Sequence, residues 1–363
     1  LAEALSGDKK IVVCTIQTFP RAIEAVRQLS ATQGKRFAVI ADEAHSSQSG
    51  EAAKQLKAVL TTEEAAELAD GGEVSSEDIL AAQMSARAED AGITFVAFTA
   101  TPKTKTMELF GTRPDPSRKP APDNVPAPFH VYSMRQAIEE KFILDVLKNY
   151  TPYRLAFKLA HDGRDLDDKE VEKSAAVKKI MGWVRLHPYN IAQKVQVVVE
   201  HYRENVQPLL NGKAKAMVVV ASRKEAVRWQ KAMRAYIQGR NYPLGVLVAF
   251  SGEVNDAESF PEAVTETSPH LNPGLKGRDI RETFAGPGYH LLLVANKFQT
   301  GFDQPLLCGM YVDKMLGGIQ AVQTLSRLNR AHPGKDTTYI LDFVNDPAEV
   351  LKAFKTYYET AEP

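Results

Sequence analysis

Two short apolar runs, each followed at once by polar residues, constrain this chain more than any other feature. The first covers residues 37–41 and is followed by Asp42 and Glu43, and the second covers residues 93–98 and is followed by the segment 99–102. Runs of this length predict strands that are buried on both faces of a parallel sheet. Open α/β sheets bind ligands at the carboxyl ends of such strands. The sequence therefore predicts a ligand site at these strand ends.

Adjacent carboxylates at that position can divide the work of nucleotide hydrolysis. One carboxylate can hold Mg²⁺ through an oxygen ligand, while the other orients or deprotonates the attacking water. We assign the metal to Asp42 and the water to Glu43. The alternative is a solvated acidic turn after a strand, and only the segments downstream decide between the two.

Length and charge limit the classes of function. The chain has 363 residues, enough for two domains that each have a core. Its formal net charge is zero, so contacts with phosphate must be local. No run reaches the roughly 20 apolar residues that cross a bilayer, and no signal peptide is visible. We expect Cys14 and Cys308 to be core residues of a cytoplasmic protein, because they lack metal-ligand spacing.

The remaining pattern divides into two parts. Ahead of the first acidic pair, the sequence predicts a strand from residue 10 that ends in polar residues, followed by a helix over 21–29. The segment 113–128 contains six prolines and predicts an extended connector. It is followed by a strand-like run over 129–134, a helix through residue 144 and a third short strand near 153–159.

A second α/β pattern follows, with helices expected across 165–210 and a break near His187. Strands alternate with helices over 223–237 and 318–328, which predicts a parallel sheet with right-handed crossovers. The loop between residues 250 and 289 is rich in Pro, Gly and Glu and predicts a surface insertion. The predicted strands cover residues 216–222, 244–250, 289–295, 309–313 and 338–343.

The segment 296–305 follows a predicted strand directly. Gly301 allows the backbone to approach a ligand closely, and Asp303 can accept hydrogen bonds from a ribose or from a neighbouring arginine. A glycine turn with a structural aspartate is the alternative.

A basic helix face is expected near the end of the chain. Gln323, Arg327 and Arg330 are spaced so that a helix presents all three on one face, while Leu325 and Leu328 point toward the core. Two arginines on one face suit a triphosphate. A solvated basic face is the alternative.

Taken together, these segments resemble the motifs of superfamily 2 helicases. Residues 42–45 are similar to the DEAH form of the Walker B motif, 99–102 to motif III, 296–305 to motif V and 323–330 to motif VI, in which Ser326 replaces the usual glycine. The resemblance implies catalytic roles for Glu43, Arg327 and Arg330, with Arg330 as the arginine finger. It implies ATP contacts for Asp42, His45, Gly301, Asp303, Gln323, Arg327 and Arg330. It implies contacts with DNA, or coupling to DNA, for Thr15, Gln17, Thr99, Thr101, Arg223 and Thr300.

Longer stretches, including residues between the motifs, resemble the restriction (R) subunit of type I restriction-modification enzymes. The matching phrases lie at 15–20, 42–50, 97–103, 129–140, 295–307 and 321–330. The resemblance implies an α/β fold with two RecA-like parallel-sheet motor domains and helical insertions, the first domain being incomplete at its N-terminus. It also implies ATP and Mg²⁺ as cofactors and double-stranded DNA as the substrate of translocation before cleavage. The implied partners are the methyltransferase (modification) and specificity subunits.

The resemblance and the proline-rich segment together give the expected domain boundaries. Motor domain one covers residues 1–112, the proline-rich connector 113–128, and motor domain two 129–345 with its helical insertion at about 165–210. Residues 346–363 are expected to begin a C-terminal helical region.

One departure from the family pattern is large. The sequence contains no Gly-x-x-x-x-Gly-Lys-Ser/Thr segment, the phosphate-binding loop of such motors, and it begins at Leu1. We expect the phosphate loop and a nuclease domain to lie outside this sequence, and this piece to be inactive alone. The missing loop leaves open a binding module for DNA or protein that has lost its ATPase function. A type III restriction or chromatin-remodelling ATPase is a further alternative.

Overall fold

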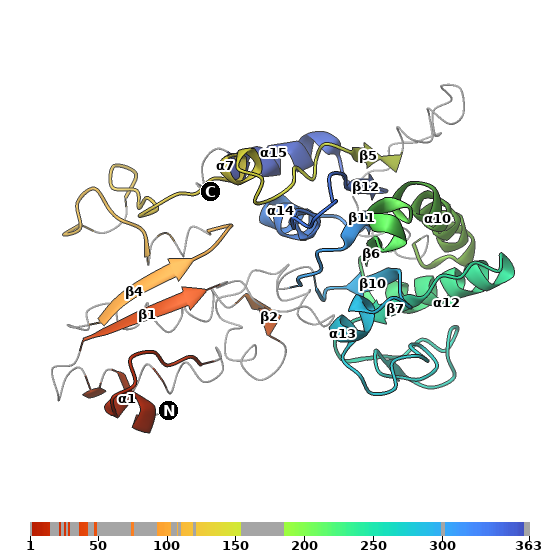
Figure 1. Cartoon of the computed structure of the whole chain (residues 1–363), viewed down its shortest axis with the longest axis horizontal. Coiled ribbons are helices and arrows are strands. Elements are labelled where there is room, and N and C mark those ends of the chain that lie inside the picture. Colours follow the sequence, from red (N-terminus) through yellow and green to blue (C-terminus); the bar gives the residue numbers. More distant parts are fainter. Residues whose placement is uncertain are drawn as a thin grey trace. The chain divides into compact units, whose positions relative to one another are not determined.

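A computed structural model describes residues 2–14, 22, 25–26, 28–29, 36–42, 47–48, 74–75, 93–102, 107, 110–118, 121–153, 185–298 and 302–358. The chain divides into two compact units (Figure 1). The first comprises residues 1–68, 73–133 and 359–363, and the second comprises 69–72 and 134–358. Within the described residues, no helix combines the length and the apolarity needed to cross a bilayer.

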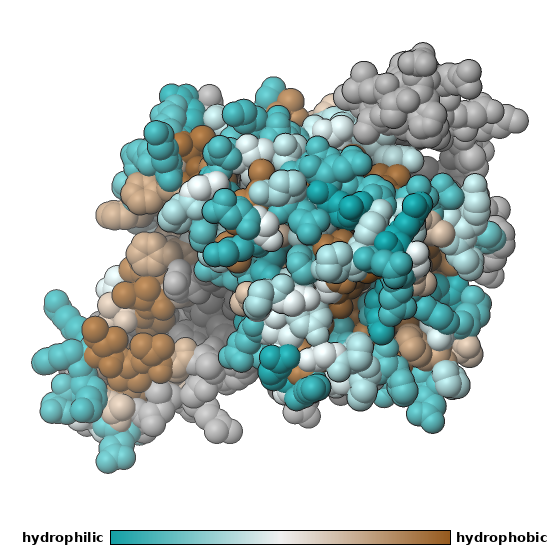
Figure 2. Space-filling model, turned by 45° about the vertical axis from the view of Figure 1, so that its right-hand side comes forward, coloured by the Kyte–Doolittle hydropathy of each residue, from teal (hydrophilic) through white to brown (hydrophobic). Residues whose placement is uncertain are grey.

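The first unit contains a parallel pair of strands, β1 (Phe37–Asp42) and β4 (Ile93–Phe98). Both strands were predicted, but the prediction that they are buried on both faces is wrong. Ile40 and Phe98 are 64% and 58% exposed, and Figure 2 shows apolar residues gathered on the surface of this unit. Burial on both faces requires a layer on each side of the sheet. Among the described residues, nothing covers the face that carries these two side chains.

The smaller elements of the first unit include helix α1 (Ala2–Ser6) and a short antiparallel pair, β2 (Ser47–Gln48) with β3 (Val74–Ser75). The strand predicted from residue 10 is wrong over 11–14, which form no regular structure. Ile11 and Val13 are 84% and 90% exposed, and Cys14 is exposed rather than a core residue. The predicted helix over 21–29 agrees with the described residues 22, 25–26 and 28–29, which are helical and bury Ala22 and Val26.

The proline-rich segment is a closed loop rather than an extended connector. Thr112 and Ala127 pair through two backbone hydrogen bonds of 2.7 and 3.0 Å. Asn124 is fully buried inside the loop, where its amide donates to the carbonyl oxygens of Asp115 and Arg118. The hydrogen bonds of the Asn124 side chain take the place of the backbone hydrogen bonds that prolines cannot donate.

The second unit is built on a six-stranded parallel sheet in the order β5-β12-β11-β6-β10-β7. The predicted α/β class and parallel sheet are therefore confirmed. Four of the strands are completely buried, in keeping with their predominantly apolar sequences. The strands are β5 (Tyr150–Pro152), β6 (Lys215–Val220), β7 (Val246–Ala249), β10 (Leu291–Ala295), β11 (Leu307–Asp313) and β12 (Tyr339–Asp342).

Helices cover both faces of this sheet (Figure 1). Alternate residues of β6 point into two separate cores, Val218 into one and Val219 into the other. The first core is closed by α10 (Pro188–His201), the π-helix η1 (Tyr202–Val206), α11 (Leu209–Gly212) and α12 (Arg223–Gly239). The second is closed by α13 (Ile280–Ala285), α14 (Gly318–Leu325), the 3₁₀ turn η2 (Ser326–Leu328) and α15 (Pro347–Tyr358). Helix α7 (Met134–Glu139) packs against α15.

Three further predictions need correction. Residues 129–133 form no strand, with Phe129 92% exposed, and the following helix ends at Glu139 instead of residue 144. The segment between β7 and β10 is not a surface insertion, because it forms the hairpin β8 (Glu253–Val254) with β9 (Val264–Thr265) and then α13. It also buries Leu271 completely. The predicted break near His187 is confirmed, since His187 caps α10 and Pro188 begins it.

Candidate functional site

The candidate site of the first unit lies at the carboxyl end of the β1–β4 pair. The two strands run parallel and in register, so that Asp42 lies opposite Phe98. Thr99 follows Phe98 directly, and its hydroxyl accepts the backbone N–H of Thr101 at 3.2 Å. Thr101 is 2% exposed. The backbone therefore brings the ends of the two predicted motifs to one edge, as the sequence indicated.

Several predicted site residues lie outside the described part of the chain. They are Thr15, Gln17, Glu43, His45, Thr300 and Gly301, together with the side chain of Asp42. Their assignments remain predictions.

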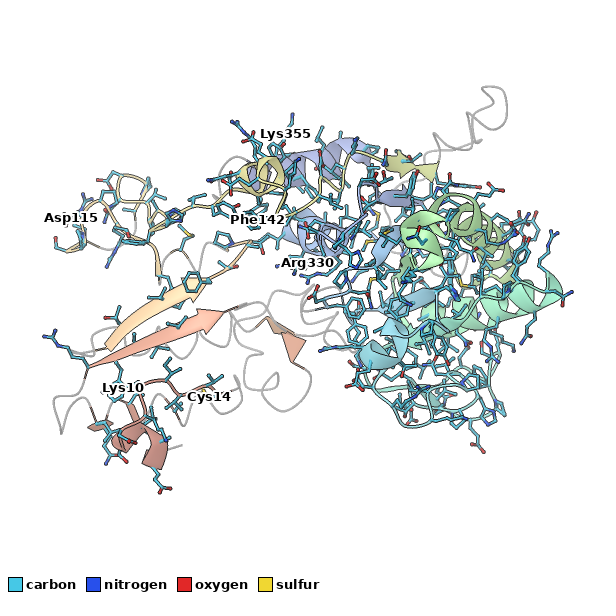
Figure 3. The ribbon with its side chains drawn as sticks, in the orientation of Figure 1. Lys10, Cys14, Asp115, Phe142, Arg330 and Lys355 are labelled. Carbon is cyan, nitrogen blue, oxygen red and sulfur yellow. The ribbon has the colours of Figure 1, made fainter. Side chains whose placement is uncertain are left out.

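The second unit has a candidate site of its own, centred on Arg330, which Figure 3 labels. Its guanidinium Nε lies 3.3 Å from Oδ1 of Asp303, and the two side chains are 39% and 72% exposed. The sequence had proposed that Asp303 accepts from a neighbouring arginine, and this pairing is the one observed. The ion pair joins the segment after β10 to the segment after α14, so two of the predicted motifs meet here.

The predicted helix face is wrong. Helix α14 ends at Leu325, η2 carries Arg327, and Arg330 lies beyond both, in a backbone bridge with Ile143. Only Gln323 is on the helix itself. The expected burial of Leu325 and Leu328 is confirmed, since both are fully buried.

Arg327 and Arg330 occupy different environments. Arg327 is 7% exposed, and its guanidinium donates to the carbonyl oxygens of Gln323 at 3.2 Å and Phe302 at 3.4 Å. It therefore ties η2 to the segment that carries Asp303. Arg330 is the more accessible of the two guanidinium groups and the better placed to meet a ligand.

The segment after β10 has an unusual backbone. Asn296 and Phe298 have φ angles of 52° and 62°, a region that bulky residues seldom occupy. Packing holds this conformation, because Phe298 stacks on Phe302 with ring centroids 4.9 Å apart. Nζ of the buried Lys314 donates to Oδ1 of Asn296 at 2.7 Å. Strain of this kind is found where surrounding contacts fix a functional loop.

Arg223, a predicted DNA-backbone residue, begins α12. Its guanidinium donates to the carbonyl oxygens of Ser251 at 3.2 Å and Glu253 at 3.4 Å. Gly252 has a φ of 80°, and a Cβ there would lie 3.0 Å from the Arg223 guanidinium. The arginine thus packs over the turn that follows β7.

Buried charges near the same sheet edge were not anticipated from the sequence. Asp313 ends β11, is 2% exposed, and accepts a 2.6 Å ion pair from Lys194 of α10. Burial, with Asp313 nearby as the next cause, raises the pKa of Glu225 to about 7. Glu225 caps its own helix, since its carboxylate accepts from Ala221 N at 3.1 Å and its N–H donates to Ser222 Oγ. The only sequence signal was the Ser-x-x-Glu spacing of a capping box.

Lys335 was also missed. It lies in the turn before β12, is 6% exposed, and burial lowers its pKa to about 8. A lone lysine in a Pro-Gly-Lys turn gives no sequence signal of burial.

The chain matches two family models. Residues 278–345 match "Type I restriction enzyme subunit R domain 3", and residues 1–180 match "SWI2/SNF2 ATPase". Two relatives are endonuclease subunits of type I restriction enzymes from Methanocaldococcus jannaschii. The MjaVIIP subunit is 30% identical over 44% of this chain and 15% of its own length. The MjaIXP subunit is 25% identical over 97% of this chain and 30% of its own length.

Among solved structures, the chain is similar to a fragment of an HsdR subunit of a type I restriction enzyme from Vibrio vulnificus YJ016. The identity is 15%, the match covers 70% of this chain and 40% of that one, and the TM-score is 0.42. The chain spans no more than 30% of the length of the two curated relatives. By its family-model matches and its restriction-enzyme relatives, this chain is similar to the restriction (R) subunits of type I restriction enzymes.

Proposed function

We propose that this chain is the major part of an ATP-driven motor that translocates double-stranded DNA before a type I restriction enzyme cleaves it. The observation that carries the proposal is the parallel register of β1 and β4, which sets Asp42 opposite Phe98 and next to the hydroxyl segment 99–101. The ion pair between Asp303 and Arg330 supports it from the second unit.

The residues present fit a nucleotide and its metal in their chemistry. Asp42 offers a carboxylate at a strand end, the kind of oxygen ligand that Mg²⁺ takes. Arg330 offers a half-exposed guanidinium, which matches the geometry of phosphate oxygens. A bound Mg²⁺ would supply positive charge that offsets the charge developing on the phosphates during hydrolysis.

Each residue then has a separate role. Asp42 holds the metal and Glu43 orients the attacking water. Arg330 stabilises charge on the phosphoryl group, and Arg327 beside it ties the turn η2 to the segment that carries Asp303. His45, Gly301 and Gln323 complete the nucleotide contacts. The residues Thr15, Gln17, Thr99, Thr101, Arg223 and Thr300 couple this chemistry to the DNA backbone.

The relatives named as endonuclease subunits support an assembly of the same kind. In this proposal the motor works beside modification and specificity subunits, which supply the recognition of the DNA site. The phosphate-binding loop of the motor is not in this sequence, so the proposed activity belongs to the full-length subunit.

Glu43→Gln in the full-length subunit tests the proposal. The variant should bind ATP with little change but lose hydrolysis stimulated by duplex DNA, and it should fail to displace a third strand from a triplex downstream. Glu262→Gln, at an exposed carboxylate of the second unit, is the matched control and should behave as wild type. Normal hydrolysis by Glu43→Gln would remove Glu43 from the mechanism. A wild-type subunit that binds DNA without any ATP turnover would instead favour the binding module.

A further inference from the structure

Lys335 makes its contacts on the segment that carries Arg330. Its side-chain Nζ donates hydrogen bonds to the carbonyl oxygens of Leu328 at 2.8 Å and Arg330 at 2.9 Å. These carbonyls belong to the chain just after α14 ends, where the regular helical bonding stops. One buried ammonium therefore binds the backbone carbonyl oxygens on both sides of Asn329.

The same segment has a second backbone support. Leu144 N donates to the carbonyl oxygen of Asn329 at 2.8 Å, and Ile143 forms a bridge with Arg330. Lys335 thus bonds the carbonyls at 328 and 330, while the strand-like segment at 143–144 bonds the one between them. Three successive carbonyl oxygens are held, so the position of the Arg330 backbone is determined from two sides.

The side chain of Arg330 starts from this fixed backbone and ends at Asp303. An arginine acting on a phosphoryl group needs its guanidinium within a fraction of an ångström of the productive position. The Asp303 contact is exposed and weak by itself, since surface ion pairs contribute little. The backbone contacts therefore carry most of the positioning.

We infer that Lys335 is a positioning residue for Arg330, which it holds in place through the backbone carbonyls at 328 and 330. The inference rests on the proposed role of Arg330 and adds a residue to that same site. Lysine suits the task because its ammonium has three donors and no acceptor, and charge-assisted hydrogen bonds are stronger than neutral ones.

The surroundings of Lys335 make this contact sensitive to pH. Burial is the main cause that lowers the pKa of Lys335 to about 8; Arg330 acts in the same direction, while Cys308 on β11 and Asp303 act against it. Burial raises the pKa of the Cys308 thiol to about 11, so this group stays neutral across the same range. His332 and Asp336, in the same turn, line a pocket of about 590 Å³ that Lys335 also lines.

Lys215 is a matched control within the same sheet. It is 3% exposed, and its Nζ likewise donates to two carbonyl oxygens, those of Gly286 at 2.9 Å and Tyr289 at 2.6 Å. Burial lowers its pKa to about 8 as well. The two lysines therefore share burial, charge and type of contact, but Lys215 holds the turn before β10 and not the arginine segment.

The experiment compares Lys335→Met, Lys215→Met and Arg330→Ala in the full-length subunit, by single-turnover ATP hydrolysis with saturating duplex DNA. Lys335→Met should lower the rate roughly 10²-fold, the loss that a misplacement of about 1 Å causes, with a small change in ATP affinity. Lys215→Met should leave the rate of hydrolysis unchanged. It should lower thermal stability by about as much as Lys335→Met does. The wild-type rate should fall as pH rises through about 8, and this fall should be absent in Lys335→Met.

A double variant separates this inference from the proposed function. If Lys335 acts only through Arg330, adding Lys335→Met to Arg330→Ala lowers the rate no further. A further loss in the double variant, or an equal loss in Lys215→Met, would contradict the positioning role. A wild-type rate for Lys335→Met beside a slow Arg330→Ala would overturn the inference alone. A wild-type rate for Arg330→Ala would overturn the proposed role of the arginine itself.

Discussion

Asp303 and Arg330 form an ion pair, Oδ1 to Nε at 3.3 Å, that joins the segment after β10 to the segment after α14. Both side chains are substantially exposed, so the pair costs little desolvation and contributes little stability. Its position matters more than its strength. It directs the guanidinium of Arg330 to the surface of the second unit, where the proposed function needs a cation.

The first prediction separates positioning from stability at this pair. Asp303→Asn should change the free energy of unfolding by less than about 1 kcal/mol, because an exposed ion pair contributes no more. The same change should lower ATP turnover in the full-length subunit, since the guanidinium of Arg330 loses its guide. Denaturant unfolding and phosphate release are the two measurements. A large loss of stability would mean that Asp303 is a structural residue and not part of the site.

The second prediction concerns the buried Glu225. Its pKa is about 7 in the folded chain against an ordinary value of 4.5. Between these two values the unfolded chain has released the proton while the folded chain still holds it, so folding stability falls as pH rises from about 4.5 to about 7. Glu225→Gln should reduce that fall, because glutamine does not titrate and can still accept from Ala221 N.

Unfolding in denaturant at the two ends of this pH range checks the prediction. The control is Glu282→Gln, at an exposed glutamate that occupies the corresponding position of α13. It should leave the pH dependence as in wild type. An unchanged pH dependence in Glu225→Gln would show that Glu225 is already ionised at low pH in the folded chain.

The third prediction concerns this 363-residue piece by itself. Because its sequence has no phosphate-binding loop, it should release phosphate from ATP at a negligible rate, with or without duplex DNA. A coupled phosphate assay on the purified piece is sufficient. DNA-stimulated turnover would mean that another segment of this sequence binds the triphosphate.

The strands were the most predictable part of the fold. The runs at β6, β10 and β11 are predominantly apolar, and such runs are typical of strands buried on both faces. The run at 11–14 is equally β-branched but remains unpaired, since propensity does not supply a partner strand. Strands β1 and β4 were both predicted, and their parallel pairing agrees with the predicted class of sheet.

Most of the wrong predictions concern segments in which a polar side chain forms hydrogen bonds with the backbone. Asn272 lies in the segment predicted to be a surface insertion, yet its side chain bonds both the N–H and the carbonyl of Val248 and so takes the place of a strand beside β7. The spacing of the side chains predicted a helix that continues past Leu325, because such spacing carries no information on the backbone hydrogen bonds that end it. The chain turns there because Lys335 Nζ and the backbone N–H of Leu144 donate hydrogen bonds to the carbonyl oxygens that follow the helix.

In the candidate site, the pairing of Asp303 with an arginine was predictable from the sequence. The environments of Arg327 and Arg330 were not predictable, because their spacing looks equivalent on an ideal helix. Only the 3₁₀ turn makes one of them buried and the other accessible.

The most direct test of the proposed motor is the DNA-stimulated ATP turnover of Arg330→Ala in the full-length subunit. An arginine finger contributes roughly 10³ to 10⁵ in rate, so turnover should fall by that order while ATP affinity changes much less. Arg135→Ala is the control, since Arg135 forms an exposed ion pair with Glu139 at 3.0 Å and should have no effect. A fall in turnover confined to Arg330→Ala is the predicted result. Equal turnover in Arg330→Ala and wild type would contradict the account and leave the arginine as solvated surface.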